Sequence, residues 1–296
     1  MKQAVFRGAA TALITPMLPD GKVDLAGMRQ LVSWQIRSGI DALVICGTTG
    51  ECATLSQTEH LQVLEAAVQE ADGRVPIIAG TGSNDTAFSA QTSREAAKLG
   101  ADALLSVTPY YNKTTQEGLV RHFTAIAESA DLPMILYNVP SRTGMDISLA
   151  TCRRLSSHPL MAGIKEASGD MGKALRIIEA CGDDLPLYTG NDDLTLPTLA
   201  CGGYGVISVL SNLLPKQMTT VCKAAFQGDF ACCRKDFLPL LPLIGLLFEE
   251  VNPIPVKKAM TLMGHPSGPL RLPLVQCSGK LEEKLRAEMK KLKLLP

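Results

Sequence analysis

Short apolar segments recur along the chain, and each is followed by a polar turn and then by a stretch with helical periodicity. Within each segment the apolar residues are continuous rather than alternating with polar ones. Continuous apolar runs are typical of parallel strands that are covered on both faces. The pattern predicts eight strands, at residues 9–14, 42–46, 75–79, 103–107, 133–139, 161–167, 185–189 and 204–210.

The segments between these strands place apolar residues three and four positions apart, as in amphipathic helices. Ser56 and Glu59 have the spacing of a capping box, which marks the start of a helix. Gly39 and Gly100 stand where two of the helices are expected to end. Helices are predicted at residues 24–38, from 56 onward, and at 85–99, 115–129, 146–157, 171–181 and 214–226.

Eight strand–helix units in succession predict an α/β fold, a (β/α)8 TIM barrel. An open, doubly wound sheet is the competing architecture, but neither a G-x-G-x-x-G segment after the first strand nor a G-x-x-x-x-G-K-[ST] segment occurs. Residues 227–296 show no strand pattern and end in the charged amphipathic segment 279–293. We therefore predict a catalytic barrel domain at residues 1–226 and a C-terminal helical domain at residues 227–296.

The charge balance narrows the classes of partner. The 29 Lys and Arg residues equal the 29 Asp and Glu residues, so the formal net charge is zero. Nucleic acids and acidic membrane surfaces are bound through a basic excess, so neither is an expected partner. The longest apolar run, 238–248, is interrupted by prolines and is shorter than the ~20 residues that span a bilayer. We expect a soluble, cytoplasmic protein.

The nine cysteines include no C-x-x-C pair, and most lie in apolar surroundings. This distribution indicates reduced cysteines that are buried in the fold. The four histidines are never paired at the spacing of zinc ligands, so we expect no metal site.

Lys165 is the most informative polar residue, because it lies inside the otherwise apolar strand 161–167 near its carboxyl end, where barrel enzymes place reactive groups. An apolar interior disfavours the ammonium form and favours the neutral amine, which attacks carbonyl carbons. Tyr137 precedes Lys165 by 28 residues. The two should lie at matching heights on adjacent strands, about 4.8 Å apart, where a phenol can shuttle protons. The alternatives are a packing tyrosine and a lysine paired with Glu166.

Two further segments belong to the same end of the predicted barrel. Residues 47–51, with the sequence GTTGE, offer backbone N–H groups and two hydroxyls, which suit a carboxylate. Arg142 follows the strand 133–139, and a guanidinium at a barrel mouth binds carboxylate or phosphate with two hydrogen bonds. An ordinary loop and a solvated arginine are the alternatives. Together these signals favour a Schiff-base lyase for small keto acids.

Three of these segments resemble the signatures of the dihydrodipicolinate synthase/N-acetylneuraminate lyase family. They are GTTGE at 47–51, YNVPSRTG at 137–144 and GIKEAS at 163–168, and NPIPVK at 252–257 extends the likeness into the helical tail. The resemblance covers essentially the whole chain. It implies a bacterial class I aldolase-type enzyme that condenses pyruvate with L-aspartate-4-semialdehyde to 4-hydroxy-tetrahydrodipicolinate, in lysine biosynthesis by the diaminopimelate route.

The resemblance also implies a role for each residue. Lys165 would form an imine with pyruvate, which makes pyruvate a covalent substrate and leaves no separate cofactor. Tyr137 would give and take protons, and Thr49 and Tyr111 would complete a hydroxyl relay. Tyr111 would reach in from a neighbouring subunit of a homotetramer built as a dimer of dimers. The implied substrate-binding residues are Thr48, Thr49, Arg142, Gly190 and Ile207.

The same family contains N-acetylneuraminate lyases and 2-keto-3-deoxy sugar-acid aldolases, which share the lysine and the tyrosine. Neuraminate lyases carry an uncharged residue where this chain has Arg142, and Ser where it has Thr in the glycine turn. A synthase is therefore favoured over a lyase. A non-catalytic pyruvate-binding module on the same barrel is the third alternative.

A regulatory cleft is the last feature that the resemblance implies. The chain keeps Asn84, His60 and Tyr110 as candidate allosteric residues. Phe88, however, stands where lysine-inhibited members of the Gram-negative and plant type carry a glutamate. An ammonium ligand without that carboxylate loses a contact of about 1.5–3 kcal/mol. We expect feedback inhibition by lysine to be weak or absent.

Overall fold

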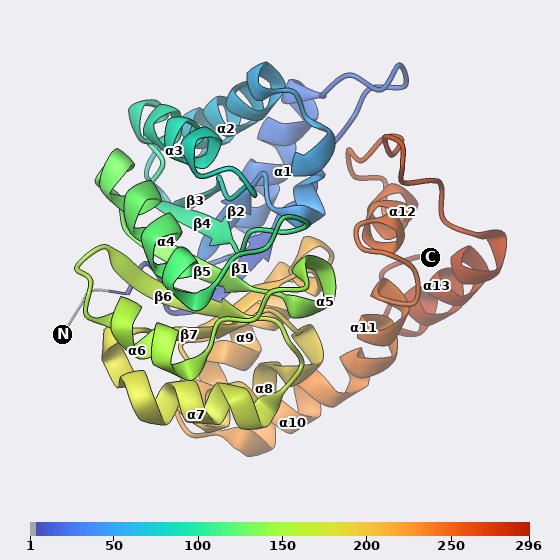
Figure 1. The fold of residues 1–296 in the computed structure, drawn as a ribbon. Coiled ribbons are helices and arrows are strands. Elements are labelled where there is room, and N and C mark those ends of the chain that lie inside the picture. The colour runs from blue at the N-terminus through green and yellow to red at the C-terminus, as the bar shows by residue number, and fades with distance from the viewer. Residues whose placement is uncertain (1–3) are drawn as a thin grey trace.

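The computed structural model describes residues 4–296. At its centre is a closed barrel of parallel strands, in which each strand pairs with the next and β8 pairs with β1 (Figure 1). This arrangement confirms the predicted TIM barrel. The strands are β1 (Gly8–Ala12), β2 (Ala42–Ile45), β3 (Ile77–Gly80), β4 (Ala103–Val107), β5 (Met134–Asn138), β6 (Met161–Glu166), β7 (Leu187–Thr189) and β8 (Gly205–Ser208).

Helices between the strands form the outer layer. They are α1 (Leu25–Arg37), α2 (Gln57–Ala71), α3 (Thr86–Leu99), α4 (Gln116–Ala130), α6 (Leu149–Ser156), α7 (Met171–Cys181), α8 (Thr195–Ala200) and α9 (Pro215–Phe226), with the short α5 (Pro140–Thr143) after β5. The capping box is confirmed, since Ser56 accepts from the Glu59 N–H and Glu59 from the Ser56 N–H. Helix α8 has no counterpart in the sequence prediction, because its six residues include Pro197 and are too few to show a period.

Several strands are shorter than the apolar runs that predicted them. In three strands, a proline explains where the strand begins. Pro76, Pro133 and Pro186 come directly before β3, β5 and β7. Each proline carbonyl still accepts a hydrogen bond from the neighbouring strand, from Leu43, Leu104 and Ile164 respectively. Proline has no N–H to continue the ladder, so the regular pairing begins one residue later.

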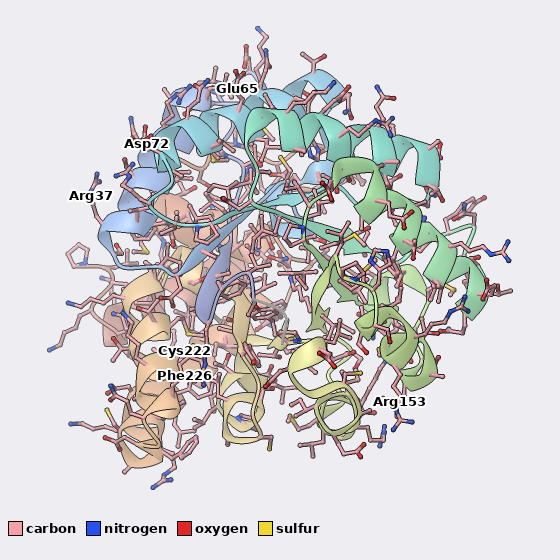
Figure 2. All side chains as sticks on the ribbon, turned by 90° about the vertical axis from the view of Figure 1, so that its left-hand side faces the viewer. Arg37, Glu65, Asp72, Arg153, Cys222 and Phe226 are labelled. Carbon is pink, nitrogen blue, oxygen red and sulfur yellow. The ribbon has the colours of Figure 1, made fainter. Side chains whose placement is uncertain are left out.

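The strand side chains face two apolar layers. One layer fills the inside of the barrel and includes Val44, Ile78, Ile135 and Ile207. The other lies between the strands and the helices and continues into the C-terminal helices. Charged side chains such as Arg37, Glu65, Asp72 and Arg153 lie on the outer surface (Figure 2). Because both faces of each strand contact apolar partners, the sequence of each strand is a continuous apolar run.

The C-terminal region folds into α10 (Phe230–Phe237), α11 (Leu241–Leu247), α12 (Ile254–Leu262) and α13 (Gly279–Lys291), and residues 263–278 form an irregular connection. Helices α11, α12 and α13 lie on one side of the barrel, the side that also carries α5 (Figure 1). Helix α9 ends at Phe226, and α10 begins at Phe230.

Among residues 4–296, no helix combines the length and the apolar character that crossing a membrane requires.

A buried ion pair joins α12 to the barrel. Lys257 Nζ lies 2.6 Å from Glu51 Oε1, and the two side chains are 2% and 0% exposed. Lys257 also donates to the carbonyl oxygens of Thr15 and Pro269. Burial lowers the pKa of Lys257, and the Glu51 carboxylate opposes that change. The ammonium thus has three oxygen acceptors in place of water.

We expect the Lys257→Ala variant to lose about 3–5 kcal/mol of unfolding free energy, because it leaves the Glu51 carboxylate buried without a counter-charge. Urea denaturation followed by circular dichroism measures this loss. Lys284→Ala is the matched control: Lys284 pairs with Glu249 on the surface, where both side chains are about two-fifths exposed, at 42% and 40%. That pair is worth about 0–1 kcal/mol. Equal losses in the two variants would contradict the prediction.

Candidate active site

Lys165 and Tyr137 meet inside the barrel, as their spacing in the sequence predicts. The register of β5 and β6 pairs Tyr137 with Lys165 directly. Both are buried, at 7% and 6% exposure, and Lys165 Nζ lies 4.3 Å from the centroid of the Tyr137 ring. Tyr137 belongs to the apolar layer that fills the barrel. An amine and a phenol are thus held together in an apolar interior near the carboxyl ends of their strands.

Gly190 follows β7, the strand beside β6, and Ile207 lies on β8, one strand further on. A Cβ atom at Gly190 would lie 2.8 Å from Lys165 Cε, so the absence of a side chain leaves room for the lysine chain. Ile207, on β8, is fully buried in the same interior layer as Tyr137. Gly190 therefore lies beside Lys165, while Ile207 shares the interior layer with Tyr137.

The segment 47–51 forms a tight turn after β2. Thr48–Gly50 is a single turn of 3-10 helix, and Glu51 follows it in the left-handed region with φ 56°. The first N–H groups of a helical turn have no acceptor within the turn, so those of Thr48 and Thr49 are available to a ligand. A Cβ at Gly50 would lie 3.2 Å from the Leu13 carbonyl oxygen, which explains why a glycine occupies this position.

Asn252, from the C-terminal region, connects two of the predicted residues. Its side-chain Nδ2 donates to Thr49 Oγ1 at 3.0 Å, and its backbone carbonyl accepts from Arg142 Nη2 at 3.2 Å. Asn252 is 7% exposed. The sequence analysis placed this residue in a family motif but gave it no role, and a contact across 203 residues leaves no local pattern from which it could be found.

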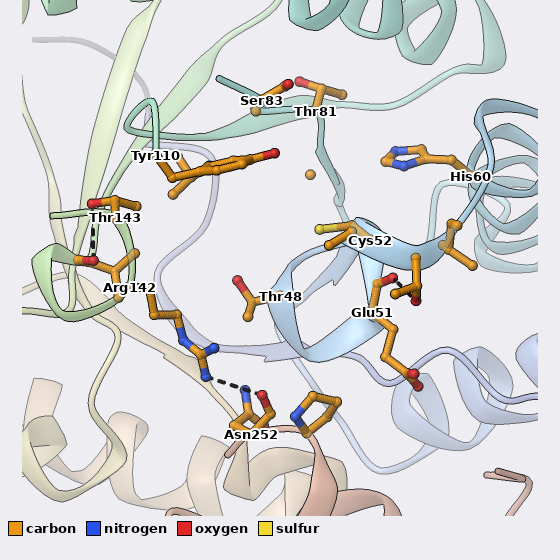
Figure 3. Close-up of a pocket in the computed structure, with 18 of the residues that line it drawn as sticks. Thr48, Glu51, Cys52, His60, Thr81, Ser83, Tyr110, Arg142, Thr143 and Asn252 are labelled. Carbon is orange, nitrogen blue, oxygen red and sulfur yellow. Dashed lines mark hydrogen bonds between the residues drawn. The ribbon is translucent and has the colours of Figure 1, made fainter. Parts of the chain in front are cut away.

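A cavity of about 450 Å3 opens beside this group (Figure 3). Thr48, Arg142 and Asn252 lie on one side of it, and His60 and Tyr110 on another (Figure 3). Residues assigned to the substrate and residues assigned to an effector thus border one cavity. Sequence analysis also did not single out its apolar lining, which includes Cys52, Leu55, Val107, Val139, Val251, Pro253 and Leu274.

Several predicted residues lie outside the cavity lining. Lys165 and Tyr137 are not among the described residues that line the cavity. Asn84 is not among them either, although the preceding Ser83 is, and the Asn84 carbonyl accepts from the side chain of Asn112. Tyr111 has φ 70° and a side chain that is 93% exposed, so it does not pack against Lys165 within its own chain.

The charges around the cavity favour an anionic ligand. Glu51 and Arg142 are the acidic and basic residues among its described lining, and Glu51 is neutralised by Lys257. Burial lowers the pKa of His60 to about 4, so its imidazole is neutral at pH 7. Burial also raises the pKa of Cys52 to about 11, which keeps it a thiol. Arg142 therefore contributes the cavity's uncompensated charge. Within residues 4–296, no group of three or more His, Cys, Asp or Glu side chains is arranged to hold a metal ion.

The chain is similar over nearly its whole length to proteins named 4-hydroxy-tetrahydrodipicolinate synthase. The 4-hydroxy-tetrahydrodipicolinate synthase of Geobacter sulfurreducens is 47% identical over 291 residues, which is 98% of this chain and 100% of that protein. The protein of the same name from Thermoanaerobacter pseudethanolicus is 47% identical and covers 98% of both chains.

Solved structures of dihydrodipicolinate synthases also match the fold of this chain over nearly its whole length. The chloride-inhibited dihydrodipicolinate synthase of Acinetobacter baumannii, complexed with pyruvate, has a TM-score of 0.96 and 43% identity and covers 98% of this chain and 99% of its own. The enzyme of Cyanidioschyzon merolae with lysine bound has a TM-score of 0.96 and 38% identity, with 99% and 100% covered. The profile of the Dihydrodipicolinate synthetase family matches residues 5–292. The chain therefore belongs to the dihydrodipicolinate synthetase family.

Proposed function

We propose that this protein is a 4-hydroxy-tetrahydrodipicolinate synthase, which condenses pyruvate with L-aspartate-4-semialdehyde in lysine biosynthesis. The observation that carries the proposal is the Lys165 amine, held 4.3 Å from the Tyr137 ring centroid inside the barrel. The relatives named above support it, because they match nearly the whole chain and share one activity. The uncompensated Arg142 at the cavity fits substrates that carry carboxylates.

Lys165 acts as the nucleophile. Its neutral amine adds to the ketone carbon of pyruvate, and loss of water leaves an imine between that carbon and Nζ. Loss of a proton from the methyl carbon converts the imine into an enamine. The enamine carbon then bonds to the aldehyde carbon of the semialdehyde, whose oxygen takes up a proton, and an imine on Nζ is formed again. Attack of the semialdehyde's amino group on the imine carbon closes the ring and releases the Lys165 amine. The Tyr137 hydroxyl gives and takes the protons of these steps, and neither a metal nor a separate cofactor takes part.

The remaining residues bind the two carboxylates. Thr48 and Thr49 hold the pyruvate carboxylate through their free N–H groups and hydroxyls. Arg142 binds the carboxylate of the semialdehyde with its guanidinium. Gly190 leaves space for the imine, and Ile207 contributes a backbone contact at the end of β8. Thr49 also joins the hydroxyl relay with Tyr137.

Tyr111 completes the relay from a second subunit. Its 93% exposed side chain extends away from its own barrel, as a residue that serves a neighbour would. We infer a homotetramer of paired dimers, located in the cytoplasm, as the family resemblance implies. An N-acetylneuraminate lyase or a sugar-acid aldolase would use Lys165 and Tyr137 in the same way, so turnover with a panel of aldehydes, including N-acetylmannosamine, separates these activities. A binding module without catalysis would show no turnover with any of them.

Borohydride reduction in the presence of pyruvate should add a pyruvate-derived mass to Lys165, detectable by peptide mass spectrometry. Lys165→Ala should abolish the labelling. Lys173→Ala is the matched control, because Lys173 also lies near β6 but is paired with Asp146 and Glu166. It should still be labelled at Lys165. An unlabelled Lys165, or equal labelling of the Lys165→Ala variant, would rule out the mechanism.

Arg142→Ala should raise the KM for the semialdehyde by about ten- to a hundredfold, the effect of losing a charged hydrogen bond, while pyruvate is still trapped on Lys165. Steady-state kinetics with each substrate varied in turn measures the two effects. Arg121→Ala serves as the control, since Arg121 is 80% exposed and pairs with Glu117 on the surface. Loss of pyruvate trapping with an unchanged KM for the semialdehyde would mean that Arg142 binds the other carboxylate.

Activity should persist at millimolar L-lysine. Phe88, which is 45% exposed, lines the cavity. It stands at the position where the ammonium group of bound lysine would require a carboxylate partner. The acidic neighbours are engaged elsewhere: Glu59 pairs with Arg271, and Asp85 accepts the N–H groups that begin α3. Phe88→Glu should be the substitution that installs inhibition, with Phe88→Gln as its uncharged control. Half-inhibition of the unaltered protein at micromolar lysine would contradict this prediction.

A further inference from the structure

The side chain of Asn252 fixes the hydrogen-bonding role of Thr49. An amide nitrogen can donate but cannot accept, so the Thr49 oxygen is the acceptor in the 3.0 Å contact with Asn252 Nδ2. The Thr49 hydroxyl has one proton of its own, and that proton cannot be given back to the same nitrogen. Thr49 must therefore donate it to a different acceptor. Asn252 thus sets the direction in which this hydroxyl points its proton.

Contacts on both sides hold the Asn252 backbone in place, while its buried side-chain Oδ1 has no hydrogen-bond partner among the described residues. Asn252 lies just before α12, whose Lys257 is locked into the buried pair with Glu51, at the end of the same turn that carries Thr49. On its other side, the Asn252 carbonyl accepts from Arg142. The turn and the C-terminal region are therefore connected at two points, one through Thr49 and one through Glu51. Movement of α12 relative to the turn would break both contacts.

We propose that Asn252 is a positioning residue for the reaction, which acts by making Thr49 a hydrogen-bond donor toward the proton relay at Tyr137. This inference rests on the proposed function, because it concerns the proton transfers of that reaction. It assigns the Asn252 side chain to Thr49 and the Asn252 backbone to Arg142. The two contacts have separate consequences, since a side-chain substitution removes the first and retains the carbonyl that makes the second.

The test is a double-mutant cycle with Asn252→Ala and Thr49→Val, with kcat and the KM of both substrates measured for each enzyme. Asn252→Ala should lower kcat about tenfold, the value of one lost hydrogen bond. The KM for the semialdehyde should change less than about twofold, because Arg142 keeps its backbone acceptor. In the Thr49→Val background, Asn252→Ala should have little further effect, because residues that act through one another are not additive.

Asn252→Asp tests the direction of the hydrogen bond. A carboxylate keeps the shape of the amide but only accepts, so kcat should fall as it does in Asn252→Ala. The negative charge of Asp at position 252 lies beside Arg142 and should alter the KM for the semialdehyde. The kcat values are therefore the quantity to compare between the variants. This variant also serves if Asn252→Ala does not fold. Ser267→Ala is the matched control, because it removes a buried hydrogen bond to Lys257 in the same region without contacting Thr49 or Arg142. Its kcat should stay within about twofold of the unaltered enzyme.

Three results would overturn the inference. They are an unchanged kcat in Asn252→Ala, a tenfold loss that persists in the Thr49→Val background, and full activity in Asn252→Asp, which would mean that Thr49 donates to residue 252. Failure of the proposed function is a different result. In that case the unaltered enzyme would neither trap pyruvate on Lys165 nor turn over the semialdehyde, whatever residue stands at position 252.

Discussion

The geometry of the active site depends on the buried ion pair between Glu51 and Lys257. Glu51 ends the turn that carries Thr48 and Thr49, and its backbone is in the left-handed region that residues with a Cβ seldom adopt. Two hydrogen bonds from the C-terminal region, from Lys257 Nζ and from the Arg271 N–H, hold its carboxylate. The C-terminal helices are therefore part of the catalytic architecture. Without them the turn at 47–51 would lose the contacts that hold the Glu51 carboxylate.

The barrel and its reactive pair were predictable because both follow from repetition. A strand covered on both faces reads as a continuous apolar run, and eight such runs define the barrel. Equal spacing along two successive units places Tyr137 beside Lys165, since parallel strands in register bring equivalent positions together. The ends of the strands were less well predicted. Apolar residues extend beyond the regular ladder, because a proline delays the start of β3, β5 and β7 and a 3-10 turn follows β2, without a change in hydropathy.

The long-range contacts could not be predicted, for a related physical reason. Asn252 and Lys257 reach back to Thr49 and Glu51 across 203 and 206 residues. Such contacts depend on how the C-terminal helices pack against the barrel, and a single sequence has no periodic signal for that packing. The resemblance to a family marked the segment 252–257 as part of the pattern. It did not say which of its atoms meet the active site. The shared cavity of Arg142, His60 and Tyr110 was missed in the same way.

The same contacts leave the site with two kinds of group that can meet an anion, the neutral donors of the turn at 47–51 and the guanidinium of Arg142. A buried carboxylate must be met by a cation or by several hydrogen-bond donors. At the inner end of the site, the turn offers neutral donors, and its acidic residue is already neutralised by Lys257. Toward the cavity, Arg142 offers a full charge that no carboxylate of the lining competes for. Asn252 lies between the two and contacts both. The barrel interior keeps Lys165 beside Tyr137 among apolar groups, while the charge of Arg142 lies outside that layer, at the cavity.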